Sequence, residues 1–375
     1  MTGTVDRRKF LRAAGVTAVG AAVAGVGGEL LLGQQFRKAP PVGMVPAGPS
    51  PASPASTTAP PPELKIHAMT PLPADETLNI DGLSPFYTPN ADFYRVDTSL
   101  VLPKVPASTW RLRIHGMVDK PMILAYDDLI QRPMIERDVT LTCVSEAVGG
   151  NYIGNARWQG TLLAPILRKA GIQSGADQIV MRDPHGMTIG VATEPVMDGR
   201  DSLLAVGMNG EVLPQAHGYP VRVVVPGLYG YVSATKWVVD MEFTTFGAFS
   251  AYWVKQTPAW SQQAPIKTES RIDVPKRLST LPAGQVTIAG VAWAQHTGIE
   301  AVEVGIDGVF YQAKLPAQDT IDTWRQWYYV WDATPGQHML EVRATDKSGY
   351  TQTAVKHKTE PNGATGYHTR LVNIT

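Results

Sequence analysis

The residue that offers the most chemistry is the only cysteine of the chain, Cys143. It ends the alternating segment 138–143, in which Val139 and Leu141 are predicted to share one strand face with it, and it enters the glycine-containing loop 144–150. The end of a strand that enters such a loop is a common place to display a reactive group. The thiol is therefore either a buried apolar side chain or, as a thiolate, a ligand for a soft metal.

A second group of reactive side chains lies in one segment, 217–237, which reads HGYPVRVVVPGLYGYVSATKW. Its apolar strand 221–225 is interrupted by Arg222, and a buried guanidinium is costly unless an anion meets it. Together with His217 and Lys236, and with glycine turns whose amide groups can point at oxygen atoms, Arg222 would form a phosphate cradle. The alternative is an internal salt bridge.

Composition excludes several classes of function. Lys+Arg and Asp+Glu are 33 each, so the chain lacks the electrostatic footprint of a nucleic-acid-binding protein, and we expect no nucleic-acid partner. A single cysteine allows neither an intrachain disulfide nor a multi-cysteine haem, zinc or iron–sulfur site. Charged residues are 18% of the chain, with 35 Gly and 30 Pro, which favours a turn-rich and strand-rich globular protein.

These reactive residues need a scaffold, and 375 residues predict two domains with additional segments. We expect an export signal or membrane anchor at 1–35, a Pro/Ala-rich linker at 36–62, an α+β domain at 75–255 and an all-β Ig-like sandwich at 264–375. In the first segment, Arg7 and Arg8 precede a weakly apolar run, which is typical of a twin-arginine signal. The protein would then be periplasmic, with the signal either cleaved or kept as an anchor.

Local patterns predict individual elements of the two domains. Segment 110–116 alternates as a strand, 126–130 suggests a helical turn, and Thr161 could cap a helix that ends at Gly171. Short alternating strands follow one another from about Ile266, separated by Asp-Gly and Ser-Gly turns. Three tryptophans of this region are expected in its core or at an interface: Trp324, Trp327 and Trp331.

Several motifs of the chain resemble the sulfite oxidase family of molybdenum enzymes. The segment HGYPVRVVVPGLYG followed by KW looks like the family's cofactor-binding signature, and TLTC, which ends at Cys143, looks like the strand that carries its metal-ligating cysteine. Segment 93–95 is similar to the F-x-R segment of sulfite oxidases and to the N-F-Y segment of the periplasmic methionine sulfoxide reductase catalytic subunit. Segment 203–211 resembles the family's LLAxxMNG stretch. The similarity extends from about Leu78 to the end of the chain.

The resemblance implies a cofactor of molybdenum and one molybdopterin per chain, with Cys143 as the metal ligand. It implies that the pterin and its phosphate are bound by residues that match the family's motifs, namely Tyr94, Arg95, Asp183, His217, Arg222, Ser233 and Lys236. Arg95 would also face the substrate. The carboxy-terminal sandwich resembles the family's dimerisation domain, so a homodimer is expected. A separate redox protein, a cytochrome or membrane subunit, would exchange electrons with the site.

The departures from the family concern the substrate. The arginine-containing loop that follows the ligand cysteine in sulfite oxidases is replaced by 144–148, which carries one acid, Glu146, and no base. A second substrate arginine is replaced by Glu360-Pro361-Asn362, and Trp260 is the nearest aromatic residue to the family's active-site tyrosine. We therefore expect oxygen-atom transfer at a small sulfur or nitrogen oxo substrate rather than at sulfite. The alternatives are a sulfoxide or N-oxide reductase, and a non-enzymatic Ig-like binding protein with an empty cofactor domain.

Overall fold

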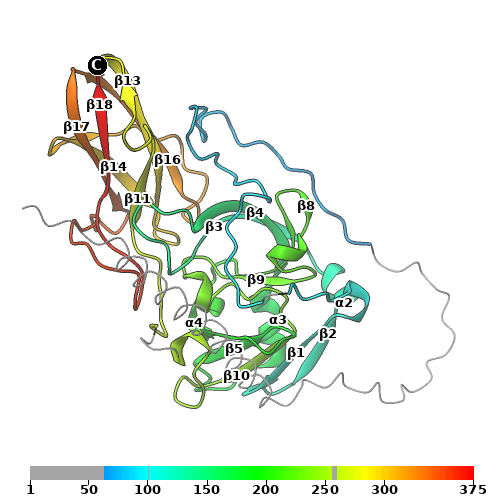
Figure 1. Ribbon diagram of the computed structural model, residues 1–375. Helices are drawn as coiled ribbons and strands as arrows, with labels where there is room; N and C mark the ends of the chain where they lie inside the picture. The colour runs from blue at the N-terminus through cyan, green and yellow to red at the C-terminus, as the bar shows by residue number, and fades with distance from the viewer. Residues whose placement is uncertain (1–62, 100, 256–259) are drawn as a thin grey trace, which may run out of the picture. The chain divides into compact units, whose positions relative to one another are not determined.

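The computed structural model describes residues 63–99, 101–255 and 260–375 (Figure 1). The predicted export signal and the whole predicted linker, residues 1–62, lie outside the described residues. Across the part of the chain that is described, no helix is both long and apolar enough to cross a membrane. Strands predominate in this part, and its helices are short.

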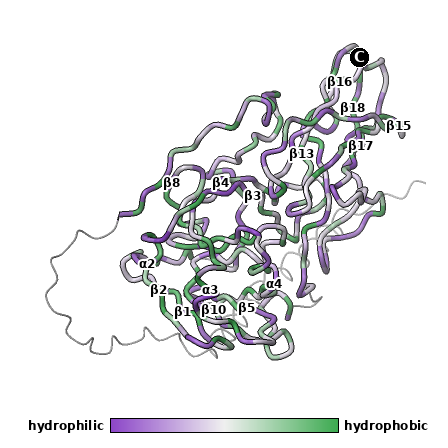
Figure 2. Tube along the Cα trace, turned by 180° about the vertical axis from the view of Figure 1, so that it is seen from behind, coloured by the Kyte–Doolittle hydropathy of each residue, from purple (hydrophilic) through white to green (hydrophobic). Residues whose placement is uncertain are grey.

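The first of the two sheets before residue 250 has five strands in the order β2-β1-β10-β5-β6. The strands are β1 (Arg111–Gly116), β2 (Met122–Ala125), β5 (Gln178–Arg182), β6 (Thr188–Ala192) and β10 (Asp240–Thr244). The associated helices are η1 (Ala107–Thr109), α2 (Tyr126–Ile130), α3 (Leu163–Ala170) and α4 (Thr193–Met197). Apolar side chains of the strands and of α3 form the largest core cluster, and Figure 2 shows hydrophobic residues along these strands.

The second sheet carries the segments that were singled out for chemistry. Its order is β3-β4-β7-β8, and β9 pairs with β7. The strands are β3 (Ile135–Thr142), β4 (Ile153–Leu162), β7 (Leu203–Met208), β8 (Glu211–Val212) and β9 (Arg222–Val224). Three short helices follow β8, β9 and β10, respectively: η2 (Gln215–His217), η3 (Gly230–Val232) and η4 (Trp253–Lys255). Cys143 comes directly after β3, and His217 ends η2, so this sheet places both groups at strand or helix ends.

After residue 264 the chain forms two further sheets. One has three strands, β11 (Glu269–Val274), β13 (Gly284–Trp293) and β16 (Arg325–Ala333). The other has the order β12-β18-β17-β14-β15, with β12 (Thr280–Leu281), β14 (Ile299–Ile306), β15 (Val309–Gln312), β17 (Gly336–Asp346) and β18 (His368–Ile374). Side chains from both sheets form one apolar cluster. The prediction that Trp324, Trp327 and Trp331 are buried is confirmed.

Three local predictions need correction. Thr161 does not cap α3, because β4 continues to Leu162, which is the N-cap residue and makes no side-chain capping bond. The strand predicted at 221–225 is shorter, since only Arg222–Val224 pair with β7. The strand expected from 138 begins earlier, at Ile135, and stops one residue before Cys143. Gly171 does end α3, with the positive φ of 70° that glycine adopts readily.

Candidate cofactor and active site

A cavity of about 150 Å³ brings together residues that lie far apart in the sequence. Six of the eight predicted site residues line it: Tyr94, Cys143, Asp183, His217, Arg222 and Lys236. The other two, Arg95 and Ser233, are not among the residues that line this cavity. The thiol and the predicted phosphate cradle therefore share one space.

Cys143 is held at the start of its loop by a hydrogen bond from its backbone N–H to the carbonyl oxygen of Tyr152, with an N···O distance of 2.9 Å. Its Sγ lies 2.8 Å from Oγ of Ser145, and the residue is 9% exposed. Burial raises the pKa of this thiol, so the protein alone favours the protonated form. A bound metal ion would reverse that preference, because a coordinating thiol is deprotonated.

Arg222 is buried on β9 and is 4% exposed. Its Nη1 donates to the carbonyl oxygen of His217 at 3.1 Å and its Nη2 to that of Ala234 at 3.4 Å, and the guanidinium lies over the ring of Trp158, 4.7 Å from its centroid. Burial lowers its pKa to about 10. No carboxylate of the described residues forms a salt bridge with it, so the alternative of an internal salt bridge is not found there. A buried guanidinium without a counter-charge fits an anionic ligand.

Lys236 does have a counter-charge, which the sequence analysis missed. Its Nζ lies 2.7 Å from Oδ2 of Asp97, and the same oxygen accepts a bond from Nε of Arg95 at 2.8 Å. Burial lowers the pKa of Lys236 to about 8, and Asp97 opposes that shift. Burial by itself would raise the pKa of Asp97. The hydrogen bonds and charges of Arg95 and Lys236 have the larger combined effect, so the pKa lies below its ordinary value. Asp97 therefore pairs with both cations and offsets one of their two charges, and the exposed Arg95 turns its guanidinium to this carboxylate.

His217 and Asp183 supply further polar groups. Nε2 of His217 lies 2.9 Å from the carbonyl oxygen of Asn90, which can only accept, so Nε2 carries the proton and Nδ1 is an acceptor. Burial lowers the pKa of this imidazole, which favours the neutral ring. The Asp183 carboxylate accepts backbone N–H bonds from His185 and Met187, both at 2.9 Å, while burial raises its pKa.

Two hydroxyl groups of the segment 217–237, those of Ser233 and Thr235, differ in their hydrogen bonding. Ser233 is buried, and its Oγ bonds to the carbonyl oxygens of Leu228 and Tyr229, both at 3.0 Å, so it stabilises the turn. Thr235 lines the cavity, and its buried Oγ1 has no hydrogen-bond partner among the described residues. An unpaired buried hydroxyl is costly, and a bound ligand would satisfy it. Its place beside Lys236 in the same motif was the signal that could have identified it.

These observations fit a cofactor with an anionic end and a metal that needs one protein ligand. Within the part of the chain that the structure describes, Arg222 has no counter-charge and Oγ1 of Thr235 has no hydrogen-bond partner. Among the described residues, no group of three or more His, Cys, Asp and Glu side chains could hold a metal ion. A cofactor that brings its own metal ligands, as a molybdopterin dithiolene does, would therefore add to the single thiolate of Cys143.

Comparison with known proteins agrees with this site. Residues 99–253 match the family described as oxidoreductase molybdopterin binding domain. The chain is 30% identical over 334 residues to mitochondrial sulfite oxidase of Macaca fascicularis, covering 75% of this chain and 59% of that protein. It is 31% identical over 197 residues to nitrate reductase [NADH] 1 of Oryza sativa subsp. japonica, covering 45% of this chain and 21% of that protein.

A solved structure, the sulfane dehydrogenase SoxCD of Paracoccus pantotrophus, is similar in fold, with a TM-score of 0.64 and 22% identity over 83% of this chain and 90% of that chain. Residues 99–253 thus form a molybdopterin-binding domain of the oxidoreductase type. The chain is thus similar to sulfite oxidases over three quarters of its length, and the cofactor of this domain class is molybdenum–molybdopterin. The chain spans 59% of the length of the sulfite oxidase that it matches.

Proposed function

We propose that this protein is an exported molybdenum–molybdopterin oxidoreductase that transfers one oxygen atom to or from a small, uncharged or weakly charged sulfur or nitrogen compound. The observation that carries the proposal is the shared cavity, into which the thiol of Cys143 and the uncompensated guanidinium of Arg222 both face. The reaction moves two electrons. In the reductive direction a sulfoxide plus two electrons and two protons gives a sulfide and water, and the oxidative direction is the reverse.

The chain's own residues would have separate roles in this site. Cys143 would hold the metal, which supplies the two-electron chemistry when it is bound. Arg222 and Thr235 would meet the phosphate of the pterin, because among the described residues Arg222 has no carboxylate partner and Oγ1 of Thr235 has no hydrogen-bond partner. Lys236 would join them by exchanging its bond with Asp97 for a bond with the phosphate. Neutral His217 would accept a hydrogen bond from the pterin at Nδ1.

The charges around the cavity support an uncharged substrate. Arg95 is the one base retained from the family's anion pocket, and Asp97 compensates it. The loop after Cys143 adds Glu146, whose pKa burial raises to about 7. A dianion in a partly dry site needs more positive charge than these groups supply. Trp260 lines the same cavity and lies near Tyr231, with ring centroids 5.9 Å apart, so we propose it as the aromatic substitute for the family's tyrosine.

Other parts of the proposal rest on the sequence. The twin arginine of the first segment supports export to the periplasm by the twin-arginine route. The signal would then be either cleaved or kept as a membrane anchor. The two carboxy-terminal sheets around one core support an Ig-like sandwich, and the family resemblance supports a homodimer through it. A separate redox protein, a cytochrome or membrane subunit, would exchange electrons with the site, since we identify no haem motif in the chain.

The first experiment is to measure molybdenum and pterin per chain in the purified protein. About one of each per chain would support the proposal, and a folded chain without either would favour the alternative of a binding protein. The second is a steady-state assay with artificial electron donors and acceptors. Turnover of sulfoxides or N-oxides with a reduced donor would identify a reductase. Turnover of sulfides with an oxidised acceptor would identify an oxidase.

A further inference from the structure

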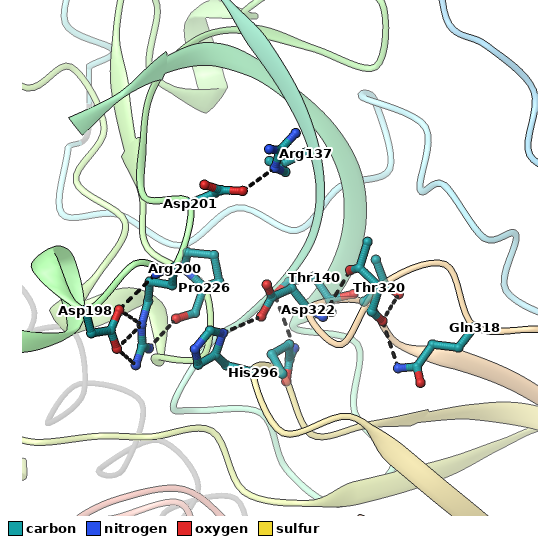
Figure 3. A network of polar contacts seen from close by, with 12 residues as sticks. Arg137, Thr140, Asp198, Arg200, Asp201, Pro226, His296, Gln318, Thr320 and Asp322 are labelled. Carbon is teal, nitrogen blue, oxygen red and sulfur yellow. Dashed lines mark hydrogen bonds and ion pairs between the residues drawn. The ribbon is translucent and has the colours of Figure 1, made fainter. Parts of the chain in front are cut away.

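The strand that leads to Cys143 is hydrogen-bonded to residues more than 150 positions further along the chain. Nε2 of Gln295 donates to the carbonyl oxygen of Thr140 at 3.1 Å and to Oγ1 of Thr142 at 2.9 Å. The backbone N–H of Thr140 donates to the carbonyl oxygen of Asp322 at 2.9 Å, and its Oγ1 accepts the N–H of Trp324 at 2.8 Å. Figure 3 shows Thr140 beside Asp322. The carboxy-terminal region thus fixes the residues just before the thiol.

The loop after Cys143 is held from the same region by Arg271 on β11. Its Nη1 donates to the carbonyl oxygen of Gly150 at 2.7 Å. The guanidinium is itself fixed, because Nε bonds Asp273 at 2.8 Å and Nη2 bonds Oγ of Ser84 at 2.9 Å. Arg271 is 8% exposed. A buried and fully oriented guanidinium that reaches one loop carbonyl restricts where that loop can lie.

His368, at the start of β18, packs against the neighbouring residue of the loop. The backbone N–H of Ile272 donates to its Nδ1 at 2.9 Å, so the ring cannot turn without losing that bond. A Cβ atom added to Gly149 would lie 2.4 Å from Nε2 of this ring and 2.3 Å from its Cδ2. Gly149 also has a φ of 78°, where glycine is favoured. The imidazole therefore touches the loop backbone with no room for a side chain.

The loop 143–152 contains internal hydrogen bonds, which connect the backbone at Gly150 to the backbone at Cys143. The Glu146 carboxylate accepts the backbone N–H of Tyr152. Gly150 donates to the carbonyl oxygen of Ala147 at 2.8 Å, and Cys143 donates to that of Tyr152 at 2.9 Å. A displacement of Gly150 would therefore move the backbone that carries Sγ.

We propose that Arg271, His368 and Gln295 are positioning residues for Cys143, and that they set the direction from which its sulfur enters the cavity. The carboxy-terminal region would then have a role in the metal site of its own chain, beyond its proposed role in dimerisation. The importance of this positioning for a metal rests on the proposed function. The contacts themselves can be tested without the cofactor.

The test uses the fact that the chain has one cysteine, so that thiol labelling reports on Cys143 alone. The full-length chain is produced in a host that cannot make molybdopterin, and the rate of alkylation by iodoacetamide is followed by intact mass. We expect Arg271→Met and Gln295→Ala each to react roughly tenfold faster than wild type, because the loop opens more often. Arg271→Lys should recover part of the protection. Equal rates in wild type and both variants would overturn the proposal.

The matched control is Arg325→Met. Arg325 also bonds backbone carbonyls, those of Ile299 and Pro316, but none in the 143–152 loop. Its alkylation rate should equal that of wild type, and an increase as large as that of Arg271→Met would show that general loosening of the fold exposes the thiol. Circular dichroism establishes that each variant is folded. Where Arg271→Met does not fold, Gln295→Ala and His368→Asn decide the outcome by the same rates.

A second measurement uses the cofactor-loaded protein. The visible absorption that arises from charge transfer between the thiolate and molybdenum depends on the orientation of the sulfur, so it should shift in Arg271→Met and stay unchanged in Arg325→Met. An unchanged band in Arg271→Met, at equal metal content, would contradict the positioning role. If the purified chain carries no molybdenum, the proposed function fails, whereas the alkylation rates still decide whether these residues position Cys143.

Discussion

The two sides of the cavity are built in different ways. The cradle side, with His217, Arg222, Thr235 and Lys236, comes from one continuous segment of the sequence. On the thiol side, the strand and loop that flank Cys143 are contacted by residues distant in the sequence: Gln295, Arg271, His368 and the segment around Asp322. The cradle could therefore be recognised as a motif, whereas the surroundings of the thiol could not.

The cations at the cavity are of two kinds, those with and those without a carboxylate partner. In the cradle, the guanidinium of Arg222 has no counter-ion among the described residues and is available for a ligand. At the edge of the cavity, Arg95 and Lys236 share the carboxylate of Asp97. A cation counted from the sequence is therefore not a measure of the charge that a ligand meets.

The largest expected effect is that of Cys143→Ser on the thiol side. A hydroxyl is a much poorer ligand for a soft metal than a thiolate, so we expect a folded protein that lacks the thiolate-to-molybdenum absorption and has lost nearly all turnover. Visible spectroscopy and steady-state kinetics measure both. Ser145→Ala, which removes the hydroxyl 2.8 Å from Sγ, is the control and should keep the absorption band. Full activity of Cys143→Ser would contradict the assignment of the ligand.

On the cradle side, Arg222→Met should lower cofactor occupancy. A charged hydrogen bond contributes roughly 1.5–3 kcal/mol, so the loss of two would weaken binding about a hundredfold or more. Molybdenum and pterin per chain are to be compared with Arg200→Met, in which the lost arginine pairs with Asp198 outside the cavity. Equal occupancy in wild type and Arg222→Met would mean that Arg222 serves the fold.

A smaller effect is expected at Asp97, which lies between the two sides. We expect sulfite to be a poor substrate of the wild-type protein, because Asp97 compensates Arg95 and Glu146 replaces a base. Asp97→Asn should lower the Michaelis constant for sulfite by about tenfold, the effect of one favourable interaction of about 1.4 kcal/mol. The exposed Asp92→Asn is the matched control. A submillimolar Michaelis constant with rapid turnover in the wild type would show that other residues rebuild an anion pocket.

The last expected effect is on stability and not on binding or turnover, and it concerns the pH dependence that arises from His368. Burial lowers its pKa to about 4 from 6.5, so between these values the unfolded chain binds more protons than the folded one. The free energy of unfolding is therefore not reduced by this ring above pH 6.5. It decreases as the pH falls from 6.5 toward 4, by about 3 kcal/mol in total. Urea unfolding at several pH values should show this slope in wild type and a shallower one in His368→Asn. Parallel slopes would mean that the ring titrates normally.

Much of the site followed from the sequence because its cues are local. An arginine within an apolar strand predicted a buried cation, and glycines beside His217 predicted turns, because both depend only on near neighbours. The short helix 126–130 was likewise predicted correctly. The cap of α3 was not, because β4 pairs with β7 as far as Leu162 and this pairing keeps Thr161 in the strand. Ser233 was assigned to the cofactor, yet the turn it stabilises uses its hydroxyl.

The sequence by itself determined the chemical type of the site: one thiol that no second cysteine can pair with, and an anion-binding segment with its cations at fixed spacing. Only the tertiary structure decided which cations are free, because Asp97 comes within 2.7 Å of Lys236 through folding and not through any local pattern. It also decided that Arg271 and His368 contact the loop after Cys143 and that Gln295 bonds the strand before it. Hydrogen bonds between residues more than 100 positions apart depend on how sheets pack, and no periodicity in the sequence encodes them.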